Sequence, residues 1–246
     1  MVSKTIEMEN TTKGTLYLVP NVLGNTAPLE VIPMSVKKII EQLRYFIFEK
    51  EKAGRAFVKR ICPTVAQNSF EVFLLNKFTS PEELHEMLKP LEQGLNVGLI
   101  TDAGCPGIAD PGADLVAIAH RHDFRVVPLV GPSSILLALM ASGLNGQSFA
   151  FNGYLPIDKT ERRKAIKQFE KKSKTLQQTQ VFIETPYRNT VLLEELCKNL
   201  DPETKLSIAC DITLSTEFIQ TKIVAQWKKS NEDLLRRPAV FSFLGS

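Results

Sequence analysis

The stretch with the clearest chemical potential is residues 98–112, which read GLITDAGCPGIADPG. An apolar run ends at Thr101, and a turn rich in glycine and proline then leads into a helical pattern. The glycines allow a ligand to approach the backbone closely, and the two prolines stiffen the turn. Asp102 supplies a carboxylate for the amine or the hydroxyls of a ligand. The spacing fits neither a classical dinucleotide site nor a P-loop. A tight strand-to-helix turn with capping aspartates is the alternative interpretation.

A second loop has similar chemistry. An apolar run over 125–130 is followed by Gly131 and Pro132, and then by Ser133 and Ser134, which open a helix. The first N–H groups of a helix have no intrahelical partner, so backbone donors and two hydroxyls meet there. Simple capping by the serines is the alternative. Because ligands of open α/β sheets bind beyond the carboxyl ends of strands, two such loops favour a shared pocket.

Apolar runs alternate with amphipathic segments along the chain, which is typical of α/β architecture. Helical patterns include 31–43, 113–122, 159–174 and 189–199. The first half predicts a largely parallel five-stranded sheet, and the second half predicts a mixed sheet with one hairpin. We therefore predict two α/β domains, 1–130 and 131–246, with the helix 133–142 as a hinge. The expected strands are 15–19, 45–48, 70–75, 96–101 and 125–130, then 148–153, 180–184, 206–211, 217–224 and 239–244.

Composition excludes several classes of protein. The chain has 246 residues, 43% of them hydrophobic and 23% charged, which indicates an ordinary globular protein. No apolar run approaches the ~18–20 residues of a membrane span, and the polar N-terminus does not resemble a signal peptide. We therefore expect a cytoplasmic protein without a membrane partner. The four cysteines lack CxxC spacing and a nearby histidine, so we expect reduced, buried thiols and no metal site.

Four ordered blocks carry a resemblance to a known family. They are ITDAGCPGIADPGADLV at 100–116, VVPLVGPSSILLALMASGL at 126–144, FNGYLP at 151–156 and FIETPYR at 182–188. In this order the blocks resemble the tetrapyrrole (corrin/porphyrin) methylase superfamily of S-adenosylmethionine-dependent methyltransferases. Within it, the chain is most similar to the branch that methylates a ribose 2′-hydroxyl of 16S rRNA.

The resemblance implies a two-domain homodimer that binds S-adenosylmethionine in a cleft between the domains, largely through the backbone. Core packing is the alternative interpretation for the three isoleucines among the implied contacts. The implied cofactor-binding residues are Pro20, Asp102, Ala103, Gly104, Ile108, Ser133, Ser134, Ile135 and Ile183.

The substrate-side segments differ from the family pattern. Residues 48–52 read FEKEK where the family has Ala-Glu-Asp-Thr-Arg, and Tyr187 stands in place of a histidine. Methyl transfer to a ribose hydroxyl needs a base, or a cation that stabilises the alkoxide. By position, the candidate catalytic residues are Glu49, Lys52 and Glu184. The first two can equally belong to the solvated start of a helix.

The net charge of +3 permits an anionic partner, and basic residues gather at 50–60 and 162–174. Both clusters could contact RNA phosphates. Ordinary charged helix faces are the alternative, because glutamates are interspersed. We predict an S-adenosylmethionine-dependent methyltransferase of RNA, with rRNA or the small ribosomal subunit as its partner. Two alternatives stay open: a methyltransferase of a tetrapyrrole or another small molecule, and a cofactor-binding protein without catalysis.

Overall fold

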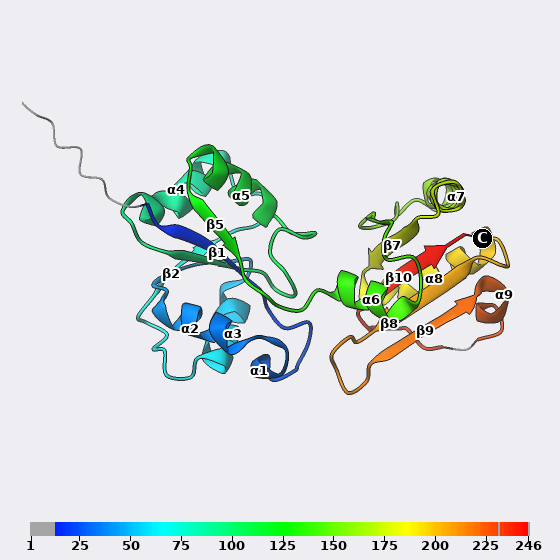
Figure 1. Ribbon diagram of the computed structural model, residues 1–246, viewed down its shortest axis with the longest axis horizontal. Coiled ribbons are helices and arrows are strands. Elements are labelled where there is room, and N and C mark those ends of the chain that lie inside the picture. Colours follow the sequence, from blue (N-terminus) through cyan, green and yellow to red (C-terminus); the bar gives the residue numbers. More distant parts are fainter. Residues whose placement is uncertain (1–12, 231, 246) are drawn as a thin grey trace, which may run out of the picture. The chain divides into compact units, whose positions relative to one another are not determined.

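The computed structural model describes residues 13–230 and 232–245, which divide into two compact units. The first unit comprises 13–22 and 27–132, and the second comprises 23–26 and 133–245. Each unit has its own five-stranded sheet and its own apolar clusters (Figure 1). The short segment 23–26 therefore belongs to the unit that most of the later chain forms.

The sheet of the first unit is entirely parallel, in the order β3-β2-β4-β1-β5. This confirms the predicted parallel sheet. Because every connection is a crossover, the carboxyl ends of all five strands lie at one edge. The strands are β1 (Thr15–Val19), β2 (Tyr45–Phe48), β3 (Glu71–Leu74), β4 (Val97–Ile100) and β5 (Arg125–Pro128).

Helices cover both faces of this sheet (Figure 1). Side chains alternate between faces along a strand. Phe46 and Phe48 therefore pack with α2 and α3, whereas Ile47 packs with α4 and α5. Burial on both faces explains why the central strands β1, β2 and β4 are almost continuously apolar. The helices are α1 (Pro28–Val31), α2 (Met34–Gln42), α3 (Glu51–Ile61), α4 (Pro81–Glu92) and α5 (Gly112–Arg121).

The expected helix over 31–43 is wrong in its first turn. The structure has two helices there, α1 and α2, separated by Ile32 and Pro33 in extended conformations. Proline has no N–H to donate and disfavours the helical conformation of the residue before it, so it interrupts the pattern. The apolar stripe continues through the break because Ile32 still reaches the core.

The second unit contains the predicted mixed sheet, in the order β6-β7-β10-β8-β9. Strands β6 and β7 are parallel, and the other pairs are antiparallel. The expected hairpin is confirmed as β8 and β9. The strands are β6 (Phe149–Phe151), β7 (Thr179–Glu184), β8 (Lys205–Cys210), β9 (Phe218–Ile223) and β10 (Ala239–Leu244).

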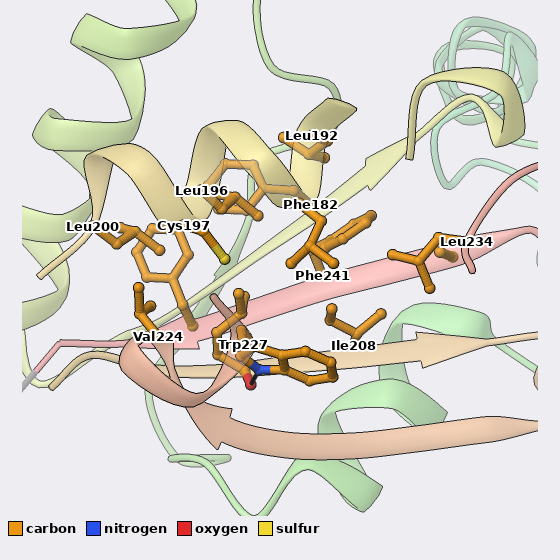
Figure 2. Close-up of a cluster of buried hydrophobic side chains, with 14 of the residues drawn as sticks. Phe182, Leu192, Leu196, Cys197, Leu200, Ile208, Val224, Trp227, Leu234 and Phe241 are labelled. Atoms are coloured by element: carbon orange, nitrogen blue, oxygen red, sulfur yellow. Dashed lines mark hydrogen bonds between the residues drawn. The ribbon is translucent and has the colours of Figure 1, made fainter. Parts of the chain in front are cut away.

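One face of this sheet carries the larger core of the unit (Figure 2). Phe182, Ile208 and Phe241 lie against Leu196 and Trp227, whose indole N–H donates to the carbonyl of Leu206 at 2.8 Å. The opposite face packs against α6. The helices are α6 (Ser134–Ser142), α7 (Lys159–Leu176), α8 (Asn189–Asn199), α9 (Val224–Trp227) and the 3₁₀ turn η1 (Pro186–Arg188).

The thiols are free, and three of the four are buried. Burial raises the pKa of Cys62 and of Cys210 to about 11, so neither is a thiolate at neutral pH. Among the described residues, no helix is long and apolar enough to cross a membrane.

Gly54 ties α3 to the sheet, and its substitution tests that contact. A Cβ at this position would lie 2.3 Å from the ring of buried Phe48. Although alanine favours a helix by ~1 kcal/mol over glycine, the overlap should lower the free energy of unfolding by about 1–3 kcal/mol in Gly54→Ala. Urea denaturation measures this. The control Gly146→Ala, where a Cβ would meet nothing within 4 Å, should be neutral. Equal midpoints for both variants would contradict the packing.

Candidate cofactor site

The carboxyl edge of the first sheet is the place where this unit can bind a ligand. Strands β1 and β4 are neighbours there, and the helices that follow them cover opposite faces of the sheet. Such a switch in connection direction opens a crevice beyond the strand ends. The loops after β1, β2, β4 and β5 therefore supply the side chains of the site.

Asn21 joins the first two of these loops. Its backbone N–H donates to the carbonyl of Gly104 at 2.8 Å, and its own carbonyl accepts from the N–H of Gly104 at 3.2 Å. The Asn21 side-chain amide donates to the carbonyls of Thr101 and Asp102 at 2.9 and 3.1 Å. Gly104 takes a φ of +74°, which glycine adopts without strain. Sequence reasoning missed Asn21, although its position directly after β1 was a usable signal.

Glu49 and Lys50, which follow β2, fix Asp102 from the other side. One Glu49 oxygen accepts from the Thr101 hydroxyl at 2.5 Å and from the N–H of Asp102 at 3.0 Å. The Lys50 ammonium forms an ion pair with the Asp102 carboxylate. Hydrogen bonding to that carboxylate raises the pKa of Lys50. The predicted catalytic residue Glu49 thus contacts the backbone that carries Asp102. Lys50, which the sequence indicated only as part of the basic cluster at 50–60, also belongs to this site.

The rest of the β4 loop is held by its own aspartate. The carboxylate of Asp110 accepts from the N–H groups of Gly107 and Gly112, at 2.9 and 2.7 Å through one oxygen. These glycine N–H groups are therefore not available to a ligand. The N–H of Ala103, by contrast, donates to no described residue. Ile108 is 52% exposed.

The β5 loop lies close to the end of β1. A Cβ on Gly131 would lie 2.3 Å from the ring of Pro20, so only glycine permits this approach. The thiol of Cys105 lies 3.4 Å from the carbonyl of Pro132. Pro20 is buried in this contact. Its surroundings therefore indicate packing between loops, and its place near a ligand stays a prediction.

The remaining predicted cofactor contacts lie in the second unit. The Ser133 hydroxyl accepts from the N–H of Leu136 at 3.4 Å, and so caps α6, of which Ser134 is the first residue. Ile135 and Ile183 belong to one apolar cluster on the α6 face of the sheet. The capping and core-packing interpretations thus account for these contacts, and a role toward a ligand stays a prediction.

Glu184 is buried in an ion pair. One of its oxygens accepts from the Arg188 guanidinium at 2.6 and 3.1 Å and from the N–H of Thr185 at 2.7 Å. A carboxylate saturated in this way is a poor proton acceptor. These contacts indicate that Glu184 holds the Arg188 guanidinium in position and does not act as a general base.

Lys52 differs from the other two candidate catalytic residues in its contacts. It is exposed on the first turn of α3 and makes no ion pair with any described residue. In the part of the chain that the structure describes, no cluster of His, Cys, Asp and Glu could hold a metal ion.

Comparison with known proteins identifies the family of this chain. Residues 24–225 match the family model of Tetrapyrrole (Corrin/Porphyrin) Methylases. The chain belongs to the tetrapyrrole methylase family. This methylase matches the ribosomal RNA small subunit methyltransferase I of Escherichia coli O157:H7 at 29% identity, over 90% of this chain and 74% of the relative. It matches the protein of that name from Leptospira borgpetersenii at 32% identity, over 86% of this chain and 80% of the relative.

Solved structures show the same fold. The methyltransferase CobJ superposes with a TM-score of 0.64 at 13% identity, covering 95% of each chain. A uroporphyrin-III C-methyltransferase from Thermus thermophilus, complexed with S-adenosyl homocysteine, superposes with a TM-score of 0.57 at 18% identity. The match covers 94% of this chain and 97% of that one. These comparisons confirm the predicted α/β fold and the predicted enzyme class, an S-adenosylmethionine-dependent methyltransferase.

The position of Asp102 should depend on Glu49. Glu49→Ala leaves the Thr101 hydroxyl and the Asp102 N–H without their acceptor, a loss of about 1–3 kcal/mol for partly buried donors. We expect the Asp102 amide to exchange with solvent about 10–100 times faster, because local opening becomes easier. Hydrogen exchange followed by NMR measures this. Glu49→Gln keeps an oxygen acceptor and should change less.

The matched control is Glu51→Ala, two residues further along, whose carboxylate pairs with Arg55 and with no other residue that the structure describes. It should leave the Asp102 amide unchanged. Parental exchange at this amide in Glu49→Ala would show that Glu49 does not hold the loop.

Proposed function

We propose that this methylase transfers the methyl group of S-adenosylmethionine to RNA and that the cofactor lies at the carboxyl edge of the first sheet. One observation carries the proposal. Asp102, at the switch point of a parallel sheet, is held in place by Glu49 and Asn21, with its carboxylate still partly open to solvent.

The groups at this edge fit a ligand that has an ammonium, hydroxyls and a flat apolar base. The Asp102 carboxylate can accept from the ammonium or the ribose hydroxyls of the cofactor. The free N–H of Ala103 can donate to an acceptor on it. Gly104 leaves room for close approach, and exposed Ile108 offers an apolar surface. The predicted cofactor contacts of the second unit, Ser133, Ser134, Ile135 and Ile183, are part of this proposal.

Lys50 occupies the carboxylate that the cofactor would use. A ligand ammonium and the Lys50 ammonium compete for the same Asp102 oxygens. Because the lysine side chain is 74% exposed, the ion pair is weak and the ligand can displace it. Displacement would leave Lys50 as a mobile cation beside the bound cofactor.

The bound cofactor supplies an already activated methyl group, so the chain's own residues need mainly to orient the acceptor and exclude water. Glu184 is committed to Arg188, and the Glu49 oxygen is committed to Thr101 and Asp102. Among the predicted catalytic residues, Lys52 is the one that makes no ion pair with a described residue. We assign it the role of a cation that stabilises the developing alkoxide.

RNA is the acceptor that the family relations and the charge distribution favour together. The relatives aligned over most of this chain are named ribosomal RNA small subunit methyltransferase I. The second unit carries an excess of basic side chains on α7. An acceptor found in ribosomes implies that the protein acts in the cytoplasm.

We also propose that the methylase acts as a homodimer. In the second unit, α6 exposes Leu136 and Met140, one turn apart, to 50% and 77%. A contiguous exposed apolar patch is typical of an interaction surface. The role of α6 as a hinge stays a prediction.

The cofactor assignment predicts opposite effects of two substitutions. Asp102→Asn removes a charged acceptor worth about 1.5–3 kcal/mol, so affinity for S-adenosylhomocysteine should fall about 10–100-fold. Lys50→Met removes the competing cation and should raise affinity up to about five-fold at low salt. Calorimetry with purified protein measures both. The control Asp114→Asn, in the first turn of α5, should bind as the parent does. Unchanged binding in Asp102→Asn would place the cofactor elsewhere.

The acceptor is tested with S-adenosylmethionine that carries a tritiated methyl group. Purified protein is offered small ribosomal subunits, naked rRNA, tRNA and a uroporphyrinogen in parallel. We expect label in RNA, and we expect the labelled linkage to resist alkali because a methylated 2′-hydroxyl cannot attack the adjacent phosphate. Label in the tetrapyrrole alone, or cofactor binding without any labelled acceptor, would each overturn the RNA proposal.

A further inference from the structure

Positive charge is concentrated on one helix of the second unit. Helix α7 contains eight lysines and arginines and two glutamates, a balance of +6, whereas the whole chain carries +3. The rest of the chain is therefore net negative. The helix packs through a narrow strip of Ala165, Ile166, Phe169 and Ser173, so most of its surface faces solvent.

Half of these basic side chains already have partners within the unit, and the other half do not. The engaged ones are Lys164 with Glu161, Lys174 with Asp201, Arg162 with the carbonyl of Ile157, and Lys172 above the ring of Phe169. The second glutamate, Glu170, accepts from the Asp201 N–H and the Thr204 hydroxyl. The residues without an ion pair to any described residue are Lys159, Arg163, Lys167 and Lys171, and all four are exposed.

These four residues, which we call the basic row, follow each other at intervals of four. Successive members are neighbours along the helix surface, about 6 Å apart along its axis, and the row spans about 18 Å. Like charges at this spacing destabilise a helix by about 0.2–0.5 kcal/mol per pair. A surface helix that only needs to be soluble places opposite charges there. The row therefore costs stability that an anionic partner would restore.

The basic cluster at 50–60 has a different character. Lys50 is paired with Asp102. Arg55 donates to Glu51 at 2.8 Å and to the carbonyl of Gln67, and its guanidinium lies 4.9 Å from the ring of Phe70. Arg55 therefore has a structural role in the first unit. In the cluster at 50–60, Lys50 and Arg55 are thus engaged, whereas α7 offers four successive cations without an ion pair to a described residue.

We propose that the basic row of α7 binds consecutive backbone phosphates of the RNA acceptor. The proposal rests on the proposed function, since it concerns the same acceptor, but it assigns a surface that the cofactor site does not include. A row of cations along a straight helix fits an extended single strand, whose phosphates are regularly spaced. Phosphate contacts of this kind set affinity and register without reading sequence.

The test compares two triple variants of the full chain that lose the same charge. The row variant is Arg163→Gln, Lys167→Gln and Lys171→Gln. The control variant neutralises three exposed lysines of the same unit outside α7: Lys205→Gln, Lys228→Gln and Lys229→Gln. Binding of a fluorescent single-stranded rRNA fragment is measured by anisotropy from 50 to 200 mM salt. Circular dichroism and S-adenosylhomocysteine affinity should match the parent in both variants.

Each lost phosphate contact changes the log–log salt slope by about 0.7 for single strands. The row variant should therefore flatten the slope by about two, which removes roughly 20-fold of the affinity loss between 50 and 200 mM salt. The control should keep the parental slope. Equal slopes in the row variant and the parent, or equal flattening in both variants, would overturn the proposal. So would binding of polyglutamate as tight as that of RNA, because the row would then suit an acidic protein.

Methyl transfer separates this proposal from the function on which it rests. If the protein methylates RNA and the row variant keeps the parental salt slope, the proposed phosphate binding by the basic row is refuted and the proposed function stands. If RNA binding depends on the basic row but no RNA is methylated, the proposed function is refuted and the proposed RNA-binding surface stands.

Discussion

A parallel sheet buried on both faces can bind a polar ligand only at its ends, and the first unit depends on this constraint. Helices cover both faces, so the chemistry gathers where β1, β2, β4 and β5 stop. The loops there stay close because Asn21 and Gly104 exchange backbone hydrogen bonds. Glu49 and Lys50 then fix Asp102 from the neighbouring strand end. Each of these contacts depends on the strand order, which sets the loops side by side.

Sequence patterns predicted the fold well, because hydrophobic periodicity records which face of an element is buried. Strand β1 and helix α8 have the expected bounds, and the hairpin of β8 and β9 followed from its short connection. The pattern failed at Pro33, where a local backbone restriction interrupts a continuous apolar stripe.

The site was predictable only in part. Glycine, proline and Asp102 marked the β4 loop, since these residue types have local conformational meaning. The partners of Asp102 lie 52 and 53 residues away in the sequence, and no local signal connects them. The same applies to Glu184, whose burial and arginine partner changed its interpretation from base to positioning residue. A charge cluster in the sequence likewise cannot show that Arg55 is engaged while Lys167 is not.

Segment 23–26 has a consequence for how the protein is made. Although only residues 20–22 separate it from β1, it packs with the second unit: the Thr26 hydroxyl donates to the carbonyl of Thr213 at 2.9 Å, and Gly24 lies against Leu214. Those partners are synthesised about 190 residues later. A nascent chain can complete the first sheet on the ribosome, but this segment lacks its partners until about 190 further residues have been synthesised. The second unit therefore needs a segment from near the start of the chain, and a chain released before Thr213 is made would leave the Thr26 hydroxyl without this partner.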